Sequence, residues 1–502
     1  MIAALIYIIL FSLLIFFFKK KQNSSIPRWM YLTAFLSKII CGFFLTYIYT
    51  NYYPDRKTAD IYKYYDDAKV IDSALERHPA DYVKIISGIG NDNLYFDTTY
   101  YAKMNNWYKR YDFGTYNDNH TIIRFNALVM PIAFGSFHVH TVFMCMLSFI
   151  GLSALVFVFI QFFPQKKWLV FLSVFFVPSV LFWGSGVLKE GILLFSIGIL
   201  IYSFYKIAFL KRTNVLTILL LILSLLLLLI NKNYLLLCLV PPLLCLYIVW
   251  KFNTKKTGLI FLGFHALLIL IGFVSVKLIL HKDPLKIISH KQRDFINLSR
   301  GGIFLLNNSN LLRIEPEEKN NLIEMPGDSC KLKQGAKHMR WSLDNFNDTL
   351  FVASNTDSGT YKMIWDLPKA GSLIQNEAIS TDIGSFIAFA PKALYNSMMQ
   401  PAITKARSLI EKMAAIENIF LVLFLIFCFA FSDFKNTNIP VLNMCVYAVL
   451  ILFLIIGYTT PVAGAIVRYK MPLLPLLLMI GINVLSIEKI KRFLPFLKTK
   501  EN

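Results

Sequence analysis

A charged pair stands at a place where the chain is otherwise apolar. Lys189 and Glu190 end the stretch V-P-S-V-L-F-W-G-S-G-V-L-K-E, residues 177–190, which lies between two apolar runs. A charge near the middle of a membrane helix costs roughly 2.5 to 3.5 kcal/mol, and less near the interface, so such charges are often functional. Either both side chains face a substrate, or Lys189 reaches the lipid headgroups while Glu190 pairs with it or caps the positive end of the helix.

A second candidate, Asp60, follows shortly after the apolar run 30–49. A carboxylate at the membrane surface could take a proton from the hydroxyl group of an acceptor. Asp60, Tyr64 and Asp67 have helical spacing, which places acidic and aromatic groups on one face of a short helix. The alternative is a surface carboxylate that pairs with Arg56 or Lys63.

The neighbouring acids Asp66 and Asp67 are the substitutes if Asp60 is not the base. Two nearby carboxylates could also bind a divalent cation, although no residue pattern requires a metal or another cofactor. His138 and His140 resemble a metal pair, but helical residues two apart point away from each other, so we interpret them as interfacial histidines.

A third candidate, Arg468, lies in G-Y-T-T-P-V-A-G-A-I-V-R-Y-K-M-P-L-L-P, near the start of the last apolar run. A guanidinium group matches phosphate oxygens in a two-pronged contact, which suits a lipid-linked phosphate or diphosphate at the interface. An anchor to lipid headgroups, assisted by Tyr469 and Lys470, fits the position equally well. Pro472 and Pro475 should loosen this helix.

Three further charged residues complete the candidate set. Arg124 lies in the short apolar run 121–134, which we interpret as an interfacial or re-entrant helix. Lys38 lies well inside the second apolar run and should face the interior of a helix bundle. Glu417 opens the ninth run and could border the same cavity as the other candidates.

Composition identifies the elements that must position these residues. The 502 residues are 56% hydrophobic and 16% charged, and the mean hydropathy is +0.55, which is typical of an α-helical polytopic membrane protein. The net charge of +21 comes largely from short basic clusters between apolar runs, as membrane topology requires, so no nucleic-acid partner is predicted. Of seven cysteines only Cys330 lies in a long polar segment, so no disulfide is expected within the extramembrane parts.

Eleven apolar runs are long enough to predict about eleven transmembrane helices. They cover residues 2–18, 30–49, 138–162, 168–184, 187–205, 213–230, 234–250, 257–280, 417–432, 440–458 and 471–487. Basic clusters fall on every other connection, which places the N-terminus outside and the C-terminus in the cytoplasm.

With this orientation, the two long polar segments face outward. The predicted organisation is two transmembrane helices (1–49), an outer loop with interfacial helices (50–137), helices three to eight (138–280), a small α+β extracytoplasmic domain (281–416), helices nine to eleven (417–487) and a basic cytoplasmic tail (488–502). Within the outer domain, 349–367 reads as two strands around an Asn-Thr-Asp-Ser-Gly turn, which predicts a β-hairpin.

This layout resembles the GT-C class of multi-span glycosyltransferases, which use lipid-phosphate sugars. Asp60, the stretch 183–190 and the R-Y-x-x-P-x-x-P motif 468–475 carry the resemblance, and F-W-G-S-G-V-L-K-E also resembles a stretch of bacterial polysaccharide-assembly proteins, including exopolysaccharide polymerases. The resemblance implies an enzyme of the bacterial cytoplasmic membrane that transfers a sugar from a polyprenyl-phosphate or diphosphate carrier to a glycan or lipid acceptor on the outer face. By analogy Asp60 is the base, and Arg468 with Lys189 holds the carrier phosphate.

Two other functions fit the same features. A polymerase or ligase of lipid-linked glycans would also use outward arginines and a large outer loop, but would not need Asp60 as base. A transporter or a membrane component of an assembly complex would carry charges at mid-membrane depth along several helices. Here the candidate charges gather mainly at the outer ends of the helices, which argues against transport.

Overall fold

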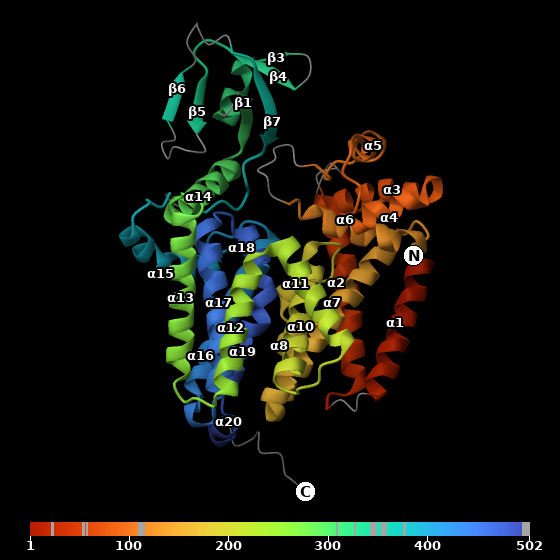
Figure 1. Cartoon of the computed structure of the whole chain (residues 1–502), viewed down its shortest axis with the longest axis vertical. Coiled ribbons are helices and arrows are strands. Elements are labelled where there is room, and N and C mark those ends of the chain that lie inside the picture. The colour runs from red at the N-terminus through yellow and green to blue at the C-terminus, as the bar shows by residue number, and fades with distance from the viewer. Residues whose placement is uncertain are drawn as a thin grey trace.

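A computed structural model describes residues 1–21, 25–52, 56, 59–108, 116–307, 310–325, 328–341, 349–352, 359–374 and 378–493. The chain forms a helix bundle that carries two polar bodies at one end (Figure 1). One body is a helical cap that follows the second long helix, and the other is a β domain inserted before the last helices.

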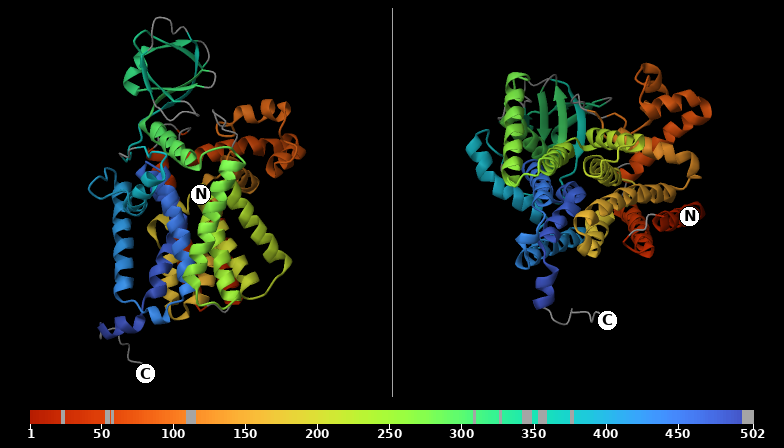
Figure 2. Two further views of the ribbon diagram at one scale, coloured as in Figure 1. Left: turned by 60° about the vertical axis from the view of Figure 1, so that its left-hand side comes forward. Right: turned by 60° about the horizontal axis from the view of Figure 1, so that its bottom comes forward.

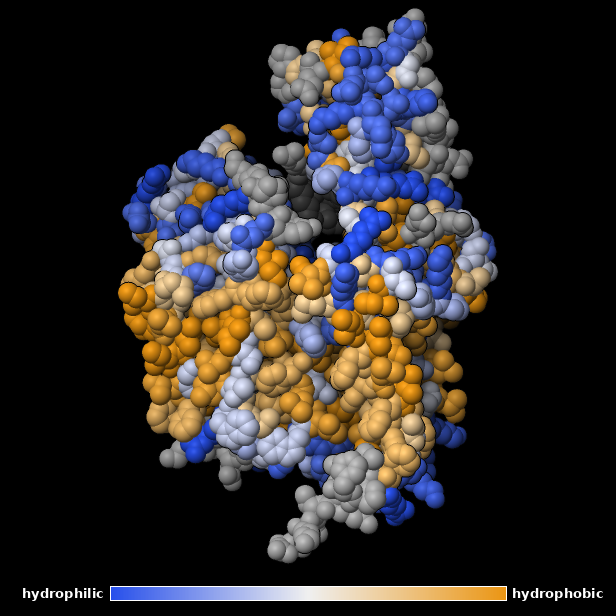
Figure 3. All heavy atoms as spheres, turned by 180° about the vertical axis from the view of Figure 1, so that it is seen from behind, coloured by the Kyte–Doolittle hydropathy of each residue, from blue (hydrophilic) through white to orange (hydrophobic). Residues whose placement is uncertain are grey.

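The bundle consists of apolar helices, as the hydropathy predicted. Nine helices in the described residues are long and apolar enough to cross a membrane. They are α2 (Arg28–Tyr52), α7 (Phe137–Phe162), α10 (Lys189–Ala208), α11 (Val215–Lys232), α12 (Tyr234–Lys251), α13 (Thr257–Leu278), α16 (Leu409–Ala430), α17 (Ile439–Thr459) and the continuous segment Ala463–Val484. The surface of the bundle is a broad apolar belt between polar ends (Figure 3). The protein is therefore a helical, multi-pass membrane protein.

Two of the eleven predicted spans differ from a long, regular helix. Helix α1 (Ile2–Lys21) is apolar only over Ile2–Phe18, and this apolar stretch is shorter than those of the nine spans. The run 168–184 is split into α8 (Lys167–Phe175) and α9 (Pro178–Trp183), with Val177 extended between them. Proline has no N–H and disfavours helical backbone at the preceding residue, so Pro178 ends one helix and starts the next.

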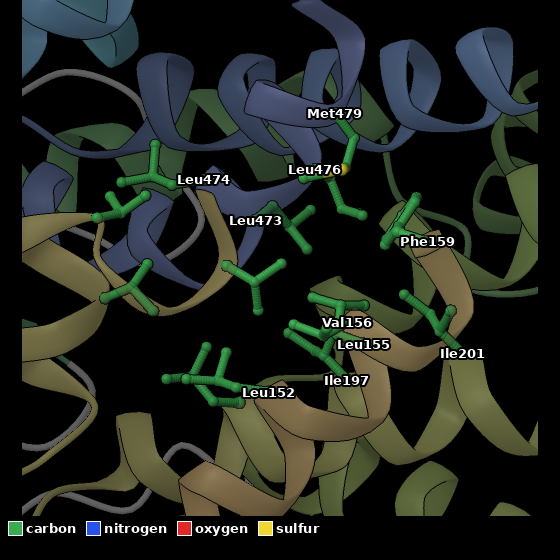
Figure 4. Packing of buried hydrophobic residues seen from close by; sticks show 14 of the residues in the cluster. Leu152, Leu155, Val156, Phe159, Ile197, Ile201, Leu473, Leu474, Leu476 and Met479 are labelled. Carbon is green, nitrogen blue, oxygen red and sulfur yellow. The ribbon is translucent and has the colours of Figure 1, made fainter. Parts of the chain in front are cut away.

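The last span is also interrupted, as its prolines predicted. Helix α18 (Ala463–Lys470) passes through the 3-10 turn η7 (Met471–Leu473) into α19 (Leu474–Val484). Helix α19 is buried along its whole length, and Leu473 and Leu476 pack towards α7 and α10 (Figure 4). The interruption therefore lies inside the protein rather than against lipid.

Helices α7 and α10 approach each other closely at two glycines. A Cβ atom on Gly198 would lie 1.9 Å from the carbonyl oxygen of Gly151, and a Cβ on Gly151 would lie 2.4 Å from Leu194 O. Only glycine allows the two backbones to come this near. Since α10 begins with Lys189, this contact helps to set the position of the charged pair.

The helical cap holds the first outer loop. It consists of α3 (Asp60–Arg77), α4 (Pro79–Ser87), α5 (Leu94–Thr99), η2 (Tyr101–Lys103), α6 (Asn119–Val129) and η3 (Met130–Ile132). Its buried residues, such as Ile61 and Ile122, form one cluster with Leu45 of α2 and Leu188 beside α10. This shared core attaches the cap to the end of the bundle.

The β domain begins after α14 (Pro284–Arg300) and is a seven-stranded antiparallel sheet, curved into a partial barrel (Figure 2). Its strands are β1 (Gly302–Asn307), β2 (Asn310–Ile314), β3 (Leu322–Met325), β4 (Ser329–Leu332), β5 (Lys337–Trp341), β6 (Thr349–Val352) and β7 (Tyr361–Leu367), in the order β3-β4-β7-β1-β2-β5-β6. The 3-10 turn η5 (Pro316–Asn321) connects β2 to β3. Helix α15 (Ile383–Met399) then returns the chain to the bundle.

The predicted hairpin 349–367 is wrong in its pairing. Strand β6 pairs with β5, whereas β7 pairs with β1 and β4. The turn on which the prediction rested falls mainly on 353–358, outside the described residues. Strand β1 lies inside the sheet, because it pairs with β2 on one side and with β7 on the other. Strand β7 occupies that position in place of a hairpin with β6.

The N-terminus and the last described helix lie at opposite ends of the bundle. The N-terminus is on the side of the cap and the β domain, while the short helix α20 (Ile487–Phe493) lies at the other end (Figures 1 and 2). The turns η4 (Pro164–Lys166) and η6 (Phe434–Asn436) join neighbouring helices. Two of the predicted basic clusters lie outside the described part of the structure. For 19–21 this holds for the side chains, and for 498–500 it holds for the whole residues.

Candidate functional site

Segments far apart in the sequence bring charged side chains together where the cap meets the bundle. We call this group the charged cluster. Its three acidic and four basic members come from α3, the start of α6, α10, α11 and α18: Asp60, Asp118 and Glu190, with Lys63, Lys189, Lys232 and Arg468. The cluster contains all four of the residues that the sequence singled out most strongly, namely Asp60, Lys189, Glu190 and Arg468.

Arg468 occupies the centre of one half of the cluster. Its Nε donates to Glu190 Oε1 at 2.8 Å, and its Nη1 lies 3.4 Å from Asp60 Oδ2. The guanidinium carbon lies 5.2 Å from the centre of the Trp183 ring, which is a cation–π distance. The side chain is 25% exposed, and its two carboxylate partners hold the guanidinium group in place.

Two lysines share one carboxylate in the other half. Lys189 Nζ lies 2.8 Å from Asp118 Oδ1, and Lys232 Nζ lies 3.2 Å from Asp118 Oδ2. Burial opposes the ionised form of Asp118, but the two ammonium groups outweigh it and hold the pKa of this carboxyl below its usual range. Asp118 and Lys232 were not among the sequence-based candidates. Lys232 ends an apolar run, which was the available signal.

Tyr64 lies between the two halves. The Lys189 ammonium is 5.7 Å from the centre of its ring. Burial, together with the negative charge of Asp60, raises the pKa of the Tyr64 hydroxyl well above its usual value. This phenol is therefore a neutral hydrogen-bonding group next to ionised neighbours. Asp60 and Tyr64 both lie on α3 and form part of the acidic and aromatic face that the sequence predicted.

A short loop places Lys189 and Glu190 in the cluster. Helix α9 ends at Trp183, and the loop 184–188 leads to Leu188, whose extended backbone caps α10. Lys38 Nζ donates to Gly184 O at 3.0 Å, so the buried lysine faces the bundle interior, as predicted, and holds this loop.

Lys189 pairs with Asp118 and not with Glu190, and only 13% of its side chain is exposed. Glu190 lies in the first turn of α10, where the positive end of the helix favours a carboxylate. It contacts Arg468 through Oε1, while Oε2 is buried and has no hydrogen-bond partner among the described residues. A buried, unpartnered carboxylate oxygen beside a cluster is a free proton or hydrogen-bond acceptor.

Asp60 is the most accessible acid of the cluster. It opens α3 and its side chain is 32% exposed. Lys63 Nζ lies 3.7 Å from Oδ1, so one of the two alternative partners considered from the sequence is present beside Arg468. The other, Arg56, donates twice to Asp66 at 2.9 Å. Asp60 thus has cationic neighbours on two sides and still faces solvent.

The acids proposed as substitutes for Asp60 lie outside the cluster. Asp66 belongs to the ion pair with Arg56 on the surface of the cap. Asp67 is buried and accepts the backbone N–H groups of Asn105 and Asn106, each at 2.8 Å. Burial nevertheless raises the pKa of Asp67. Both side chains stabilise the cap itself.

Arg124 and Tyr469 have different places. Arg124 Nε donates to Ile85 O at 2.8 Å, and its guanidinium group lies 5.3 Å from the Trp107 ring, so this arginine joins elements within the cap. The Tyr469 ring lies 5.6 Å from Lys232 Nζ, which places it against the cluster next to Arg468.

Glu417 belongs to a second buried polar group. It accepts the backbone N–H of Ser179 at 2.9 Å and also the Ser179 hydroxyl. In the same group, Lys470 Nζ donates to Asn418 Oδ1 at 2.6 Å and to Ser397 O at 3.0 Å. These bonds join α9, α15, α16 and α18. Glu417 therefore connects helices rather than lining the charged cluster.

The histidines and carboxylates do not form a recognisable metal centre in the part of the chain that the structure describes, where no three His, Cys, Asp or Glu side chains are placed to hold an ion. His138 packs edge-on against Phe43 at 4.8 Å, and His140 Nδ1 lies 2.9 Å from Asn126 Oδ1. The two histidines thus have separate partners.

The site combines three kinds of chemistry at one end of a membrane bundle. Arg468, Lys189 and Lys232 offer positive charge suited to an anionic head group, and Asp60 and Glu190 offer carboxylates suited to proton transfer. Trp183, Tyr64 and Tyr469 add aromatic surface. Comparison with protein-family models, curated protein sequences and solved structures finds no match to this chain. Its class, a multi-pass helical membrane protein with a charged cluster at one polar end, is therefore defined by fold and site alone.

Proposed function

We propose that the protein is a glycosyltransferase that takes a sugar from a polyprenyl-phosphate or diphosphate carrier and acts in the assembly of a cell-surface polysaccharide or glycoconjugate. The observation that carries the proposal is the position of Arg468 between Asp60 and Glu190. A lipid carrier keeps its chain in the bilayer and presents its phosphate at the interface, where this group lies.

In the proposed reaction, an acid of the charged cluster removes a proton and the basic residues bind the leaving phosphate. Asp60 takes the proton of an acceptor hydroxyl, whose oxygen forms a bond to the anomeric carbon of the sugar. The bond between that carbon and the phosphate oxygen breaks, and the phosphate leaves with its electron pair. Arg468 and Lys189 bind the leaving phosphate, whose negative charge grows during the step. Glu190 orients Arg468 through its Nε contact.

The proposal includes an orientation in the bacterial cytoplasmic membrane. Counting α1 and the α8–α9 pair as crossings gives eleven, with the N-terminus outside and the C-terminus in the cytoplasm. The cap and the β domain would then face outward on both sides of the surface hollow in Figure 3. An acceptor glycan could approach through that hollow.

The test is deletion of the gene in its host and complementation with variants. Asp60→Asn removes the proposed base, and Arg468→Lys replaces the two-pronged contact by a single charge. The matched control is Asp66→Asn, which changes an acid on the same helix outside the cluster. Mass spectrometry of lipid-linked sugars and gel analysis of surface polysaccharide are the readouts.

We expect the deletion strain to accumulate an unextended lipid-linked acceptor and its sugar donor. Asp60→Asn should behave like the deletion, Arg468→Lys should restore transfer poorly, and Asp66→Asn should restore it fully at equal protein levels. Unchanged lipid-linked sugars in the deletion strain would overturn the proposed activity.

One observation favours the glycan polymerase or ligase as a second candidate. Asp60 has Lys63 at 3.7 Å and Arg468 at 3.4 Å, so both of its carboxylate oxygens already contact a cation, and a polymerase or ligase would not need this residue as the base. Intact single-sugar transfer with loss of long polymer in Asp60→Asn would favour this function. A transporter or assembly component predicts no change in glycosidic linkage in any variant.

A further inference from the structure

A groove of about 600 Å³ lies on the outer rim of the bundle, away from the charged cluster. It is formed where α13 ends, α14 begins and α15 begins. The polar residues that line it are Lys277, His281, Lys282, Asp283, Thr381 and Asp382. The end of α13 and the start of α15 meet at this groove.

The helices below the groove expose apolar side chains. Helix α13 is the least buried of the candidate spans, with 11% of its apolar window buried. On its outer half Ile269 is 71% exposed and Leu278 is 67% exposed, and on α15 Ile383 and Ile387 are 61% and 69% exposed. A hydrocarbon chain can therefore lie along either helix and reach the groove from the side.

The upper end of the groove holds three basic side chains and two carboxylates. Lys277, His281 and Lys282 have no side-chain hydrogen bond or ion pair with any residue that the structure describes. The two acids of the groove are already committed as helix caps. Asp283 Oδ1 accepts Leu285 N at 2.9 Å, and Asp382 Oδ1 accepts Ser385 N at 2.8 Å. Two lysines at the end of an apolar helix thus remain available to an anion.

We propose that this groove binds the phosphate head group of an anionic membrane lipid. Its acyl chains lie against α13 and α15, and its phosphate lies between Lys277 and Lys282 near the Thr381 hydroxyl. Unpaired lysines at the end of an apolar helix suit the phosphate of an anionic lipid, and the exposed apolar side chains of α13 and α15 suit its acyl chains. The bound lipid would join the end of the bundle to α14, which carries the β domain. This site is independent of the proposed glycosyl transfer.

The test uses the full-length protein in a neutral detergent. Phosphatidylglycerol, phosphatidylcholine or inorganic phosphate is added in steps, and bound lipid is counted by native mass spectrometry while thermal unfolding is followed in parallel. The groove variant is Lys277→Gln/Lys282→Gln. The matched control is Lys255→Gln/Lys256→Gln, which removes two lysines at the opposite end of the same helix.

We expect the wild type to retain phosphatidylglycerol in preference to phosphatidylcholine, with a higher unfolding temperature. The groove variant should bind phosphatidylglycerol about 30-fold more weakly, since each lysine near a membrane surface contributes roughly a factor of five. The control should bind as the wild type does. Equal losses in both double variants, no headgroup preference in the wild type, or an equal effect of inorganic phosphate would overturn the proposal. If the double variant does not fold, Lys282→Gln alone should still weaken binding several-fold.

Discussion

At the scale of single residues, the charged cluster is held together by ion pairs of unequal burial. Glu190 is 7% exposed and depends on Arg468, whereas the Arg56–Asp66 pair on the same side of the protein is 49% and 33% exposed. Removing one partner of a buried pair leaves an unpaired charge, whereas an exposed pair is well solvated. Loss of the Arg468–Glu190 ion pair should therefore destabilise the protein more than loss of the Arg56–Asp66 ion pair.

We predict that Arg468→Ala lowers the free energy of unfolding by about 3 kcal/mol, because the Glu190 carboxylate loses its charged partner. Arg468→Leu/Glu190→Leu should recover most of the loss, while abolishing the proposed activity. Thermal unfolding of the purified protein in one detergent measures both. Arg56→Ala should cost about 1 kcal/mol or less. Equal losses at Arg468 and Arg56 would contradict the burial argument.

The lowered pKa of Asp118 makes a prediction about pH. A carboxyl group with a lower pKa in the folded than in the unfolded protein stabilises the fold at neutral pH, and this stabilisation is lost as the pH falls through the folded pKa. Asp118→Asn should therefore unfold at a lower temperature than the wild type at pH 7. The difference should shrink steadily below about pH 4, the ordinary range of aspartate. A difference that stays constant down to pH 3 would show that the Lys189 and Lys232 contacts do not depend on the charge.

At the scale of elements, two interruptions and one close crossing position the cluster. Pro178 splits a membrane segment into α8 and α9, and the loop after Trp183 lets α10 start at the polar end of the bundle. The crossing of α7 and α10 at Gly151 and Gly198 then sets how far α10 lies from its neighbour. The positions of the charged side chains depend on this helix crossing, although none of these side chains lies in it.

We predict that Gly198→Ala destabilises the protein by about 1 to 3 kcal/mol, because the added Cβ would lie 1.9 Å from Gly151 O and must push two backbones apart. Gly263→Ala is the control, since no atom lies within 4 Å of its added Cβ on the lipid-facing helix α13. That change should be neutral or slightly stabilising, by up to about 1 kcal/mol. Unfolding in detergent distinguishes the two. Similar effects at both glycines would mean that the crossing is not close-packed.

At the scale of the whole molecule, an apolar belt separates a polar end with two folded bodies from a smaller polar end (Figure 3). The proposed orientation places the larger end outside the cell. A cysteine at the exposed position Gln334 of the β domain should react with a membrane-impermeant thiol reagent in intact cells. A cysteine introduced in place of Lys255, just before the start of α13, should react only after the membrane is permeabilised. Six of the seven native cysteines are buried, so their background labelling is low. The reverse pattern would contradict the orientation.

The helical membrane class, most of the spans and the presence of two polar bodies follow from the sequence by itself. Hydropathy and the period of apolar residues are local properties, because a bilayer requires each spanning segment to satisfy its own backbone hydrogen bonds. Pro472 and Pro475 predicted a loosened helix, and the 3-10 turn between α18 and α19 lies at this place. The same local signals singled out Lys189 and Arg468, since a charge next to an apolar run is visible without any partner.

Only the tertiary structure decided which charges meet. Asp118 and Lys232 carry no distinctive motif, and they join the cluster because the cap packs across the ends of α10 and α11. The hairpin prediction was wrong for the same reason, since β7 was placed by the buried strand β1 and not by the turn that precedes it. Ion pairing and strand order depend on residues far apart in the sequence, so no local pattern encodes them. Burial of a shared core brings them into contact.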